Sequence, residues 1–347
     1  MKEGIPTRQI GKTGLKLHRI GYGCASLGNL YRPVTDETAR DAVLAALDAG
    51  VCYFDTAPYY GFGLSERRVG DVLRRRARDS FVLSTKVGRL LKPCADVDES
   101  QERYGFCSPM PFEPVYDYSY SGIMRSYEDS LQRLGINRID ILYVHDIGEL
   151  THGPDNAHHF KTLLESGYRA LDELRAAGEI SAFGLGVNEY EVCEAAMAYG
   201  DYDCFLLAGR YTLLEQEALL SFLPACEKRS VSVIIGGVYN SGILALGTES
   251  GKPLYYNYEP APQDIIDRVR AIEAVCKMYQ VPLAAAALRF PLCHPTVASL
   301  IPGMGSPKRI TQTLSLLNTP IPSVFWNTLI DQGLLRGDAP IPDEGGL

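Results

Sequence analysis

Short apolar runs alternate with amphipathic stretches along almost the whole chain. Eight runs rich in β-branched residues have the length and composition of buried strands. They cover residues 20–22, 51–54, 81–85, 139–144, 180–185, 204–207, 231–235 and 297–301. Between them, apolar residues recur at helical spacing over 35–49, 65–75, 122–134, 161–177, 189–198, 216–229 and 264–279. The pattern therefore predicts strands that alternate with helices.

Strands that are apolar on both faces and alternate with helices indicate a parallel sheet covered by helices. About eight such units in 347 residues fit a closed (β/α)₈ TIM barrel, although an open, doubly wound sheet has the same rhythm. No stretch has the composition of a linker, so we expect one domain over residues 1–347. Ahead of the first strand, residues 8–10 and 15–17 flank Gly-Lys-Thr-Gly, which predicts a short hairpin over one end of the barrel.

Three connections are too long to be simple turns: residues 90–121, 148–158 and 236–263. Each follows a predicted strand, so in a barrel all three lie on the carboxyl-terminal face, where active sites form. The first is rich in proline and aromatic residues.

The amino-acid composition of the chain disfavours several classes of function. The chain carries a formal charge of −8, with 46% hydrophobic and 22% charged residues, which indicates a globular protein and disfavours nucleic acid or an anionic membrane as partner. We find no apolar segment typical of a secretory signal and none of the roughly 18 residues that a membrane span needs. The nine cysteines are scattered and no metal-binding motif occurs, so we expect reduced thiols, no metal and a cytoplasmic location.

Two common enzyme classes fit the motifs poorly. Four G-x-G starts occur, but the third glycine of a Rossmann fingerprint is replaced each time, by Ser26, Glu66, Glu189 and Lys308. A glycosidase needs a pair of catalytic carboxylates. Only Asp55 and Asp146 lie near strand ends, and neither has an obvious carboxylate partner.

Polar residues close three successive strands. Asp55 ends the second, Lys86 the third and His145 the fourth, while Tyr60 follows in the loop after Asp55. Neighbouring strand ends of a barrel meet on one small patch. A phenol with a pKa of about 10 is a poor acid or base near neutrality, but an adjacent ammonium stabilises its anion, and a carboxylate keeps that ammonium charged. The set suits proton transfer coupled to hydride transfer at a carbonyl or alcohol carbon.

These residues resemble the aldo-keto reductases. The resemblance rests on Phe-Asp-Thr-Ala at 54–57, Tyr60–Gly61, Lys86 and His145, and it extends from residue 10 to beyond residue 303. It implies that Tyr60 is the general acid/base, that Asp55 and Lys86 tune it, and that His145 binds the reacting oxygen. It also implies a nicotinamide dinucleotide that lies extended across the barrel mouth without a Rossmann fold.

The same resemblance implies where that cofactor binds. Ser306 and Pro307 form an N-cap and N1 pair that opens a helix able to receive a phosphate. The implied cofactor contacts are Gly23, Asn188, Gly237, Tyr239, Ser241, Gly242, Leu244, Gly303, Ser306, Arg309, Gln312 and Thr313.

The chain departs from the family pattern at three sites. Many NADPH-dependent members have a lysine and a serine where this chain has Gly303 and Met304, so we expect NAD to be preferred while NADP still binds. The family's Ser-Asn pair aligns with Gly186 and Val187, and Asn188 follows one residue later. The aromatic residue that often stacks on nicotinamide is replaced by Gly236, with Tyr239 nearby.

Within the family, segments 111–120, 208–214 and 238–242 look like the D-threo-aldose 1-dehydrogenases, also called L-fucose dehydrogenases. We therefore expect oxidation of the C1 hydroxyl of a cyclic aldose to a lactone. Glu113 and Asp117 are candidate acceptors for sugar hydroxyls, beside aromatic rings that either bind substrate or pack the loop onto the barrel. Pyridoxal 4-dehydrogenases share similar segments, and pyridoxal forms an internal hemiacetal, so pyridoxal oxidation to 4-pyridoxolactone is the alternative.

A function of another class also fits the resemblance. Potassium-channel β-subunits show that this fold can serve mainly as a cofactor-sensing binding module. Turnover of a small-molecule substrate distinguishes the two classes. The sequence leaves the oligomeric state open.

Overall fold

The computed structural model describes residues 5–98 and 100–342. Eight parallel strands form one sheet, in the order β3-β4-β5-β8-β9-β10-β11-β14. Their bounds are β3 Tyr22–Gly23, β4 Tyr53–Asp55, β5 Val82–Val87, β8 Ile141–His145, β9 Ala182–Val187, β10 Cys204–Ala208, β11 Ser232–Gly236 and β14 Val297–Leu300.

The two end strands of this sheet meet. Parallel bridges join Ile20 to Leu300 and Gly23 to Gly303. Gly21 N donates to Leu300 O at 2.7 Å, so the hydrogen-bond ladder continues from the last strand to the first. The sheet is therefore a closed barrel, which confirms the predicted (β/α)₈ fold over the open alternative.

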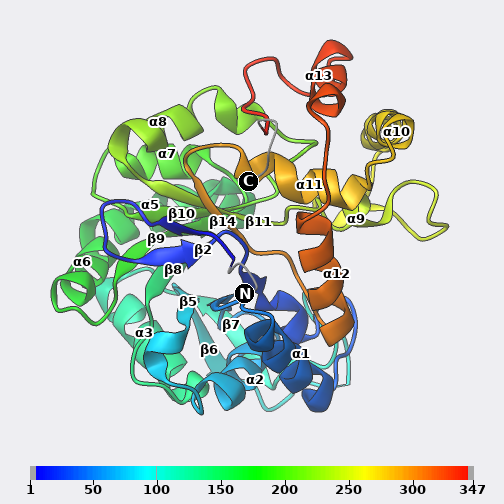
Figure 1. Ribbon diagram of the computed structural model, residues 1–347. Coiled ribbons are helices and arrows are strands. Elements are labelled where there is room, and N and C mark those ends of the chain that lie inside the picture. Colours follow the sequence, from blue (N-terminus) through cyan, green and yellow to red (C-terminus); the bar gives the residue numbers. More distant parts are fainter. Residues whose placement is uncertain (1–4, 99, 343–347) are drawn as a thin grey trace.

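Helices surround the barrel (Figure 1). Those that follow the strands or cover the barrel are α1 Asp36–Asp48, α2 Leu64–Leu73, α3 Tyr120–Leu134, α6 Tyr168–Ala176, α7 Glu191–Met197, α8 Phe222–Arg229, α10 Gln263–Met278, α11 Leu283–Leu292, α12 Pro307–Leu317 and α13 Ser323–Asp331. Short helices α4 Glu149–His152, α5 Asn156–Thr162 and α9 Ile243–Leu246 lie in the connections. The predicted helix 161–177 is interrupted by a π-turn over Leu163–Gly167, and in the predicted helix 216–229 a 3₁₀ turn over Glu217–Leu219 precedes α8.

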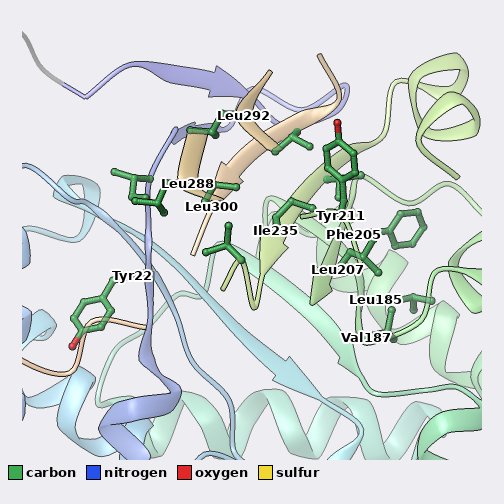
Figure 2. Packing of buried hydrophobic residues seen from close by; sticks show 14 of the residues in the cluster. Tyr22, Leu185, Val187, Phe205, Leu207, Tyr211, Ile235, Leu288, Leu292 and Leu300 are labelled. Carbon is green, nitrogen blue, oxygen red and sulfur yellow. The ribbon is translucent and has the colours of Figure 1, made fainter. Parts of the chain in front are cut away.

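The strands alternate between two cores because successive side chains point to opposite faces. On β10, Phe205 and Leu207 join the outer core between sheet and helices, whereas Cys204 and Leu206 join the inner core of the barrel. Figure 2 shows part of the outer core, where side chains of β9, β10, β11, β14 and α11 pack together. This period of two decides which polar side chains face the interior of the barrel.

The N-terminal hairpin closes one end of the barrel, as predicted. Strands β1 (Thr7–Gln9) and β2 (Lys16–His18) pair antiparallel. Ile10 and Leu17 are fully buried in the inner core. Arg8 Nη1 donates to Pro295 O at 2.7 Å and to Val297 O at 3.0 Å, which fixes the hairpin against the start of β14. The opposite end of the barrel stays free for the long connections.

Those connections contain structure that the apolar pattern did not predict. Residues 90–121 include a hairpin of β6 (Arg89–Pro93) and β7 (Phe112–Tyr116), and residues 236–263 include one of β12 (Tyr255–Tyr256) and β13 (Glu259–Pro260). Helices α11 and α13 were also absent from the prediction. Eight of the ten residues of α11 are buried, so it lacks the polar face that makes an amphipathic period visible.

Within the described residues, no helix by itself combines the length and apolarity that a bilayer span requires; only α10 and α11 taken together, across a bend of 100°, reach them.

Candidate active site

Polar side chains gather inside the barrel at its carboxyl-terminal end. Asp55, Lys86 and His145 each lie in register on the inner face of β4, β5 and β8, because they continue the inward rows of Tyr53, Ser84 and Tyr143. All three side chains are buried, with at most 5% of their surface exposed. Strand register and period thus bring together residues that are up to 90 positions apart in the chain.

Lys86 is the centre of this group. Its Nζ donates to Asp55 Oδ2 at 2.7 Å and to Thr56 O at 2.9 Å, and it lies 4.6 Å from the centre of the Tyr60 ring. The other carboxylate oxygen of Asp55 accepts from Ser84 Oγ at 2.7 Å. The buried carboxylate is therefore satisfied on both oxygens, and the ammonium is held against the phenol.

Glycines on β9 make room for this arrangement. A Cβ at Gly186 would lie 3.5 Å from Lys86 Cε and 3.1 Å from Tyr143 Cβ, and one at Gly184 would lie 1.5 Å from Cys204 O. The Gly184–Gly186 pair, which resembles the start of a dinucleotide fingerprint, thus serves the packing of the barrel interior.

Tyr60 lies in the turn between β4 and α2, and it is half-buried. The turn is fixed by Tyr60 O, which accepts from Ser65 N at 3.1 Å, and by Gly61, whose φ of +64° suits glycine. A Cβ at Gly61 would lie 2.5 Å from Gly28 O, so the turn packs directly against the segment after β3. The phenol is therefore held rigidly over the strand ends.

The environment shifts the pKa values of the group. Burial raises the pKa of the Tyr60 phenol, and the positive charge of Lys86 opposes only part of that rise. For Lys86 itself, burial acts to lower the pKa, but the Asp55 carboxylate and the Tyr60 phenol raise it further, so the amine stays charged. Lysine thus acts on tyrosine in the expected direction, yet burial outweighs it.

His145 completes the group as a neutral imidazole. Its ring stands perpendicular to the Tyr60 ring with 6.0 Å between centres. Burial, together with the charges of Arg89 and Lys86, lowers its pKa well below the usual 6.5. Its Nε2 lies 3.5 Å from Asp146 Oδ2, and its backbone oxygen accepts from Tyr118 Oη at 2.9 Å. A neutral imidazole can donate one hydrogen bond to a reacting oxygen without placing a positive charge beside it.

A second ion pair, missed from the sequence, adjoins His145. Arg89 Nη2 donates to Asp146 Oδ2 at 2.5 Å, and the other oxygen of Asp146 accepts from Asn188 Nδ2 at 3.1 Å. Tyr258 Oη in turn lies 3.4 Å from Asn188 Oδ1. The available signal was the proximity of Arg89 to Lys86 and of Asp146 to His145 in the chain, but only the fold shows that they pair.

A cavity of about 1040 Å³ opens above these residues. Aromatic side chains from different connections form much of its wall: Tyr31, Tyr59, Tyr60, Tyr104, Phe106, Tyr255 and Tyr258. The connections 90–121 and 236–263 therefore do meet at the carboxyl-terminal face, as predicted.

Two expected sugar ligands lie elsewhere, which corrects the prediction. Glu113 pairs with Arg103 at 2.7 Å, and Asp117 pairs with Arg125 at 2.9 Å. Neither lines the cavity among the described residues. Both carboxylates are thus paired with arginine side chains of the protein itself. The expectation failed because a sequence pattern does not show which cation each carboxylate meets. Of the loop aromatics, Tyr104 and Phe106 line the cavity, while Tyr118 is buried behind it.

The residues expected to bind the cofactor lie in several different parts of the structure. Asn188 and Ser241 line the cavity. Gly23 and Gly303 face each other in the bridge that closes the barrel. Leu244 is fully buried in the outer core, so its side chain cannot contact a cofactor, and only its backbone remains for the expected role.

The remaining expected contacts follow β11 and β14. Gly237, Tyr239 and Gly242 lie in the turn that leads to α9. Burial raises the pKa of the Tyr239 phenol, and the charge of Arg309 opposes part of that rise. Ser306 is the N-cap of α12, as predicted, and its side chain accepts from Arg309 N. On the same helix Gln312 is exposed and Thr313 is buried.

These surroundings fit a dinucleotide. The capped start of α12 offers backbone N–H groups to a phosphate, and Lys308 and Arg309 lie in its first turn. Arg32 and Lys252 line the cavity, and the Arg32 guanidinium lies beside Gly305. A Cβ at Gly303 would meet no atom within 4 Å, so the backbone there is open to a ligand.

A parallel β/α barrel with a buried Asp–Lys pair against a tyrosine, a neutral histidine and a dinucleotide-sized cavity defines a barrel oxidoreductase. The chain belongs to the aldo/keto reductase family, whose model matches residues 19–331. It is an NAD(P)-dependent oxidoreductase of that family.

Two curated relatives span nearly the whole chain. Pyridoxal 4-dehydrogenase of Microbacterium luteolum is 45% identical over 94% of this chain and 97% of its own length. D-threo-aldose 1-dehydrogenase of a Pseudomonas species is 39% identical over 93% and 96%. Among solved structures, the holo form of an aldo-keto reductase from Bacillus halodurans has a TM-score of 0.72 and 24% identity, with 98% of this chain and 99% of that chain covered.

Proposed function

We propose that the protein oxidises a cyclic hemiacetal to a lactone by transferring the hydride of the hemiacetal carbon to NAD(P). The observation that carries the proposal is the buried Asp55–Lys86 pair held against Tyr60, beside a neutral His145, at the floor of an aromatic cavity. Both curated relatives carry names of dehydrogenases whose substrates form such hemiacetals.

The proposed roles follow from the geometry. Tyr60, as its anion, accepts the proton of the substrate hydroxyl, while Lys86 stabilises that anion and Asp55 keeps Lys86 charged. His145 donates from Nε2 to the same substrate oxygen and orients it. A nicotinamide dinucleotide bound in this cavity would supply the hydride acceptor for the oxidation.

Three observations support pyridoxal as substrate. The cavity is walled by seven tyrosine and phenylalanine rings, which offer flat apolar faces to an aromatic ring. Glu113 and Asp117, expected to accept sugar hydroxyls, are paired elsewhere. The ion pairs Lys86–Asp55 and Arg89–Asp146 leave the cavity floor electrically balanced, which suits a molecule without net charge.

A D-threo-aldose such as L-fucose is the second candidate. Arg89, Asp146 and Asn188 place several hydrogen-bonding groups on the cavity wall next to His145, which suits a ligand with several hydroxyls. The relative at 39% identity acts, by its name, on this class.

We also propose that NAD is the preferred cofactor and that NADP is used less well. Gly303 provides no charge for a 2′-phosphate, and Met304 has no hydroxyl and is fully buried in the outer core. Arg309 and Lys308 remain near the start of α12.

The test is NAD⁺ reduction with pyridoxal, L-fucose, D-arabinose and L-galactose, each followed by identification of the lactone. Two matched compounds serve as controls. Pyridoxal 5′-phosphate cannot close the internal hemiacetal because its 5′-oxygen is esterified, and a methyl glycoside lacks the free C1 hydroxyl. We expect turnover of one parent class and none of its blocked form. Binding of NADH without turnover of any parent would instead favour a cofactor-sensing module.

A further inference from the structure

Arg89 is the buried cation of the cavity that the proposed proton transfer does not use. We infer that Arg89, held in place by Asp146, is a specificity-determining residue that binds the oxygen substituent next to the hemiacetal carbon. The inference rests on the proposed function, because it names the part of the substrate that the same cavity recognises.

Burial and several contacts hold the Arg89 side chain in its position. It begins β6, it is only 4% exposed, and it lines the cavity. Its guanidinium lies over the Tyr59 ring at 4.2 Å and over the Tyr116 ring at 5.2 Å. A cation buried between two rings and a carboxylate is held in one orientation, since each contact restricts its planar group.

Asp146 connects this arginine to the reacting centre. One carboxylate oxygen, Oδ2, accepts from Arg89 Nη2 at 2.5 Å and lies 3.5 Å from His145 Nε2. The guanidinium and the imidazole therefore flank a single oxygen atom. A substrate oxygen held by His145 would therefore have Arg89 as a neighbouring cation on the cavity wall.

The backbone conformation of Asp146 supports a role for this residue in the binding site. Its φ is +47°, in the left-handed region that non-glycine residues rarely adopt, and its N–H donates to Gly186 O at 2.9 Å. This conformation lets Asp146 pair with Arg89 on one side and with Asn188 on the other. Strained residues of this kind persist where the surrounding structure fixes them, often at binding sites.

Arg89 also keeps donors for a ligand. A guanidinium has five N–H donors. The described contacts use one hydrogen bond from Nη2 to Asp146 and one with the Tyr59 side chain. Nε has no acceptor among the described residues but is itself covered, so the donors that remain for a ligand are on the two terminal nitrogens. A buried arginine with unused donors on a cavity wall is suited to a ligand oxygen, because unsatisfied buried donors are costly.

Both proposed substrate classes carry an oxygen close to the hemiacetal carbon, two bonds away in an aldose and three bonds away in pyridoxal. A cyclic aldose has its 2-hydroxyl on the carbon bonded to C1. The hemiacetal form of pyridoxal has its 3-oxygen on the ring carbon beside the one that bears the hemiacetal carbon, and this oxygen is anionic at neutral pH. The shared chemistry is an oxygen acceptor adjacent to the reacting group, and the two substrate arms of the test separate the sources.

The experiment compares each parent substrate with the analogue that lacks this oxygen. The pairs are L-fucose with its 2-deoxy analogue, and pyridoxal with its 3-deoxy analogue. The ratio of kcat/KM, parent over deoxy, is measured for the full-length wild type, for Arg89→Met and for Arg89→Lys. Arg89→Lys keeps a positive charge beside Asp146, so it decides the matter if Arg89→Met fails to fold.

We expect the wild type to prefer its parent substrate about 10- to 100-fold, the range of one hydrogen bond to a charged group. In Arg89→Met this ratio falls to within about threefold of unity, and in Arg89→Lys it falls to an intermediate value, mainly through a higher KM for the parent.

Arg103→Met is the matched control. Arg103 lies on the same long connection, pairs with Glu113 at 2.7 Å and lies 4.7 Å over the Phe62 ring, but it does not line the cavity. Its parent-to-deoxy ratio should equal that of the wild type. NADH binding and the melting temperature are recorded for every variant, so that a loss of fold is seen directly.

Two results overturn the inference and are distinguishable. If the wild type oxidises a parent substrate but Arg89→Met and Arg89→Lys keep its parent-to-deoxy ratio, the inference is wrong while the proposed function stands. If the wild type oxidises neither parent, the proposed function fails and the inference fails with it.

Discussion

Two opposed effects act on the pKa of the Tyr60 phenol. Burial disfavours its anion, while the ammonium of Lys86 favours it, and the net effect raises the pKa of the phenol. The proposed oxidation needs the anion, so the reaction depends on how much of it forms at the working pH.

The first prediction concerns this phenol. Tyr60→Phe removes the hydroxyl and keeps the ring that contacts Lys86, so we expect kcat to fall by at least about 100-fold, the scale for loss of a general acid or base. NADH affinity, measured by fluorescence titration, should change little. Turnover close to that of the wild type would rule out the proposed role.

The second prediction is the pH profile. Because the pKa of Tyr60 is raised above 10, its anion is a small fraction near neutrality that grows about tenfold per pH unit. We expect kcat/KM for oxidation to rise with pH from about 6 to 9, with no inflection near 6.5, since the pKa of His145 lies well below that value. A plateau beginning near pH 7 would contradict this assignment, and Tyr60→Phe should lack the rise.

At the scale of elements, the start of α12 decides how a cofactor phosphate is held. Ser306 caps the helix, and Lys308 and Arg309 lie in its first turn. Gly303 precedes this helix, is itself exposed, and a side chain there would meet no neighbour within 4 Å. A new side chain there can therefore be tested without disturbing the core.

The third prediction changes this position. The wild type should have a higher kcat/KM with NAD than with NADP. Gly303→Lys adds one charged contact, so the NADP-to-NAD ratio of kcat/KM should rise about 10- to 100-fold. Gly303→Gln, which has similar length without the charge, is the control and should shift the ratio far less. A wild type that already prefers NADP would contradict the expectation.

At the scale of the whole molecule, the barrel depends on close contact between neighbouring strands. The ladder closes between β3 and β14, and β9 approaches β10 so closely that a Cβ at Gly184 would lie 1.5 Å from Cys204 O. The same closure brings the ends of β4, β5 and β8 around one cavity. Stability and site geometry therefore share a cause.

The fourth prediction follows from that contact. Gly184→Ala forces β9 and β10 apart, and overpacking of this kind should lower the free energy of unfolding by about 3 kcal/mol or more. Gly14→Ala is the control, since a Cβ there meets nothing within 4 Å, and its effect should stay within about 0.5 kcal/mol. Urea unfolding followed by circular dichroism measures both. Equal stability of the two variants would show that β9 and β10 accommodate the added methyl group without strain.

The local sequence determined the strands and the proposed catalytic set, whereas closure of the sheet into a barrel was seen only in the bridges between its end strands. The eight apolar runs predicted all eight strands of the sheet, since a strand buried on both faces must be apolar along its length. Asp55, Lys86 and His145 could be assigned to one patch because parallel strands of a barrel end on the same face. Ser306 could be assigned as an N-cap because capping depends only on adjacent residues.

The tertiary structure alone decided which charges meet. Arg89 could have paired with several carboxylates, and the fold places it against Asp146; Glu113 was expected at the substrate and instead meets Arg103. The sequence likewise did not show that α11 is a helix, because burial on all sides removes its polar face. Ion pairs between distant loops depend on separations of a few ångströms that no local pattern encodes, whereas strands, caps and strand-end positions follow from neighbours along the chain.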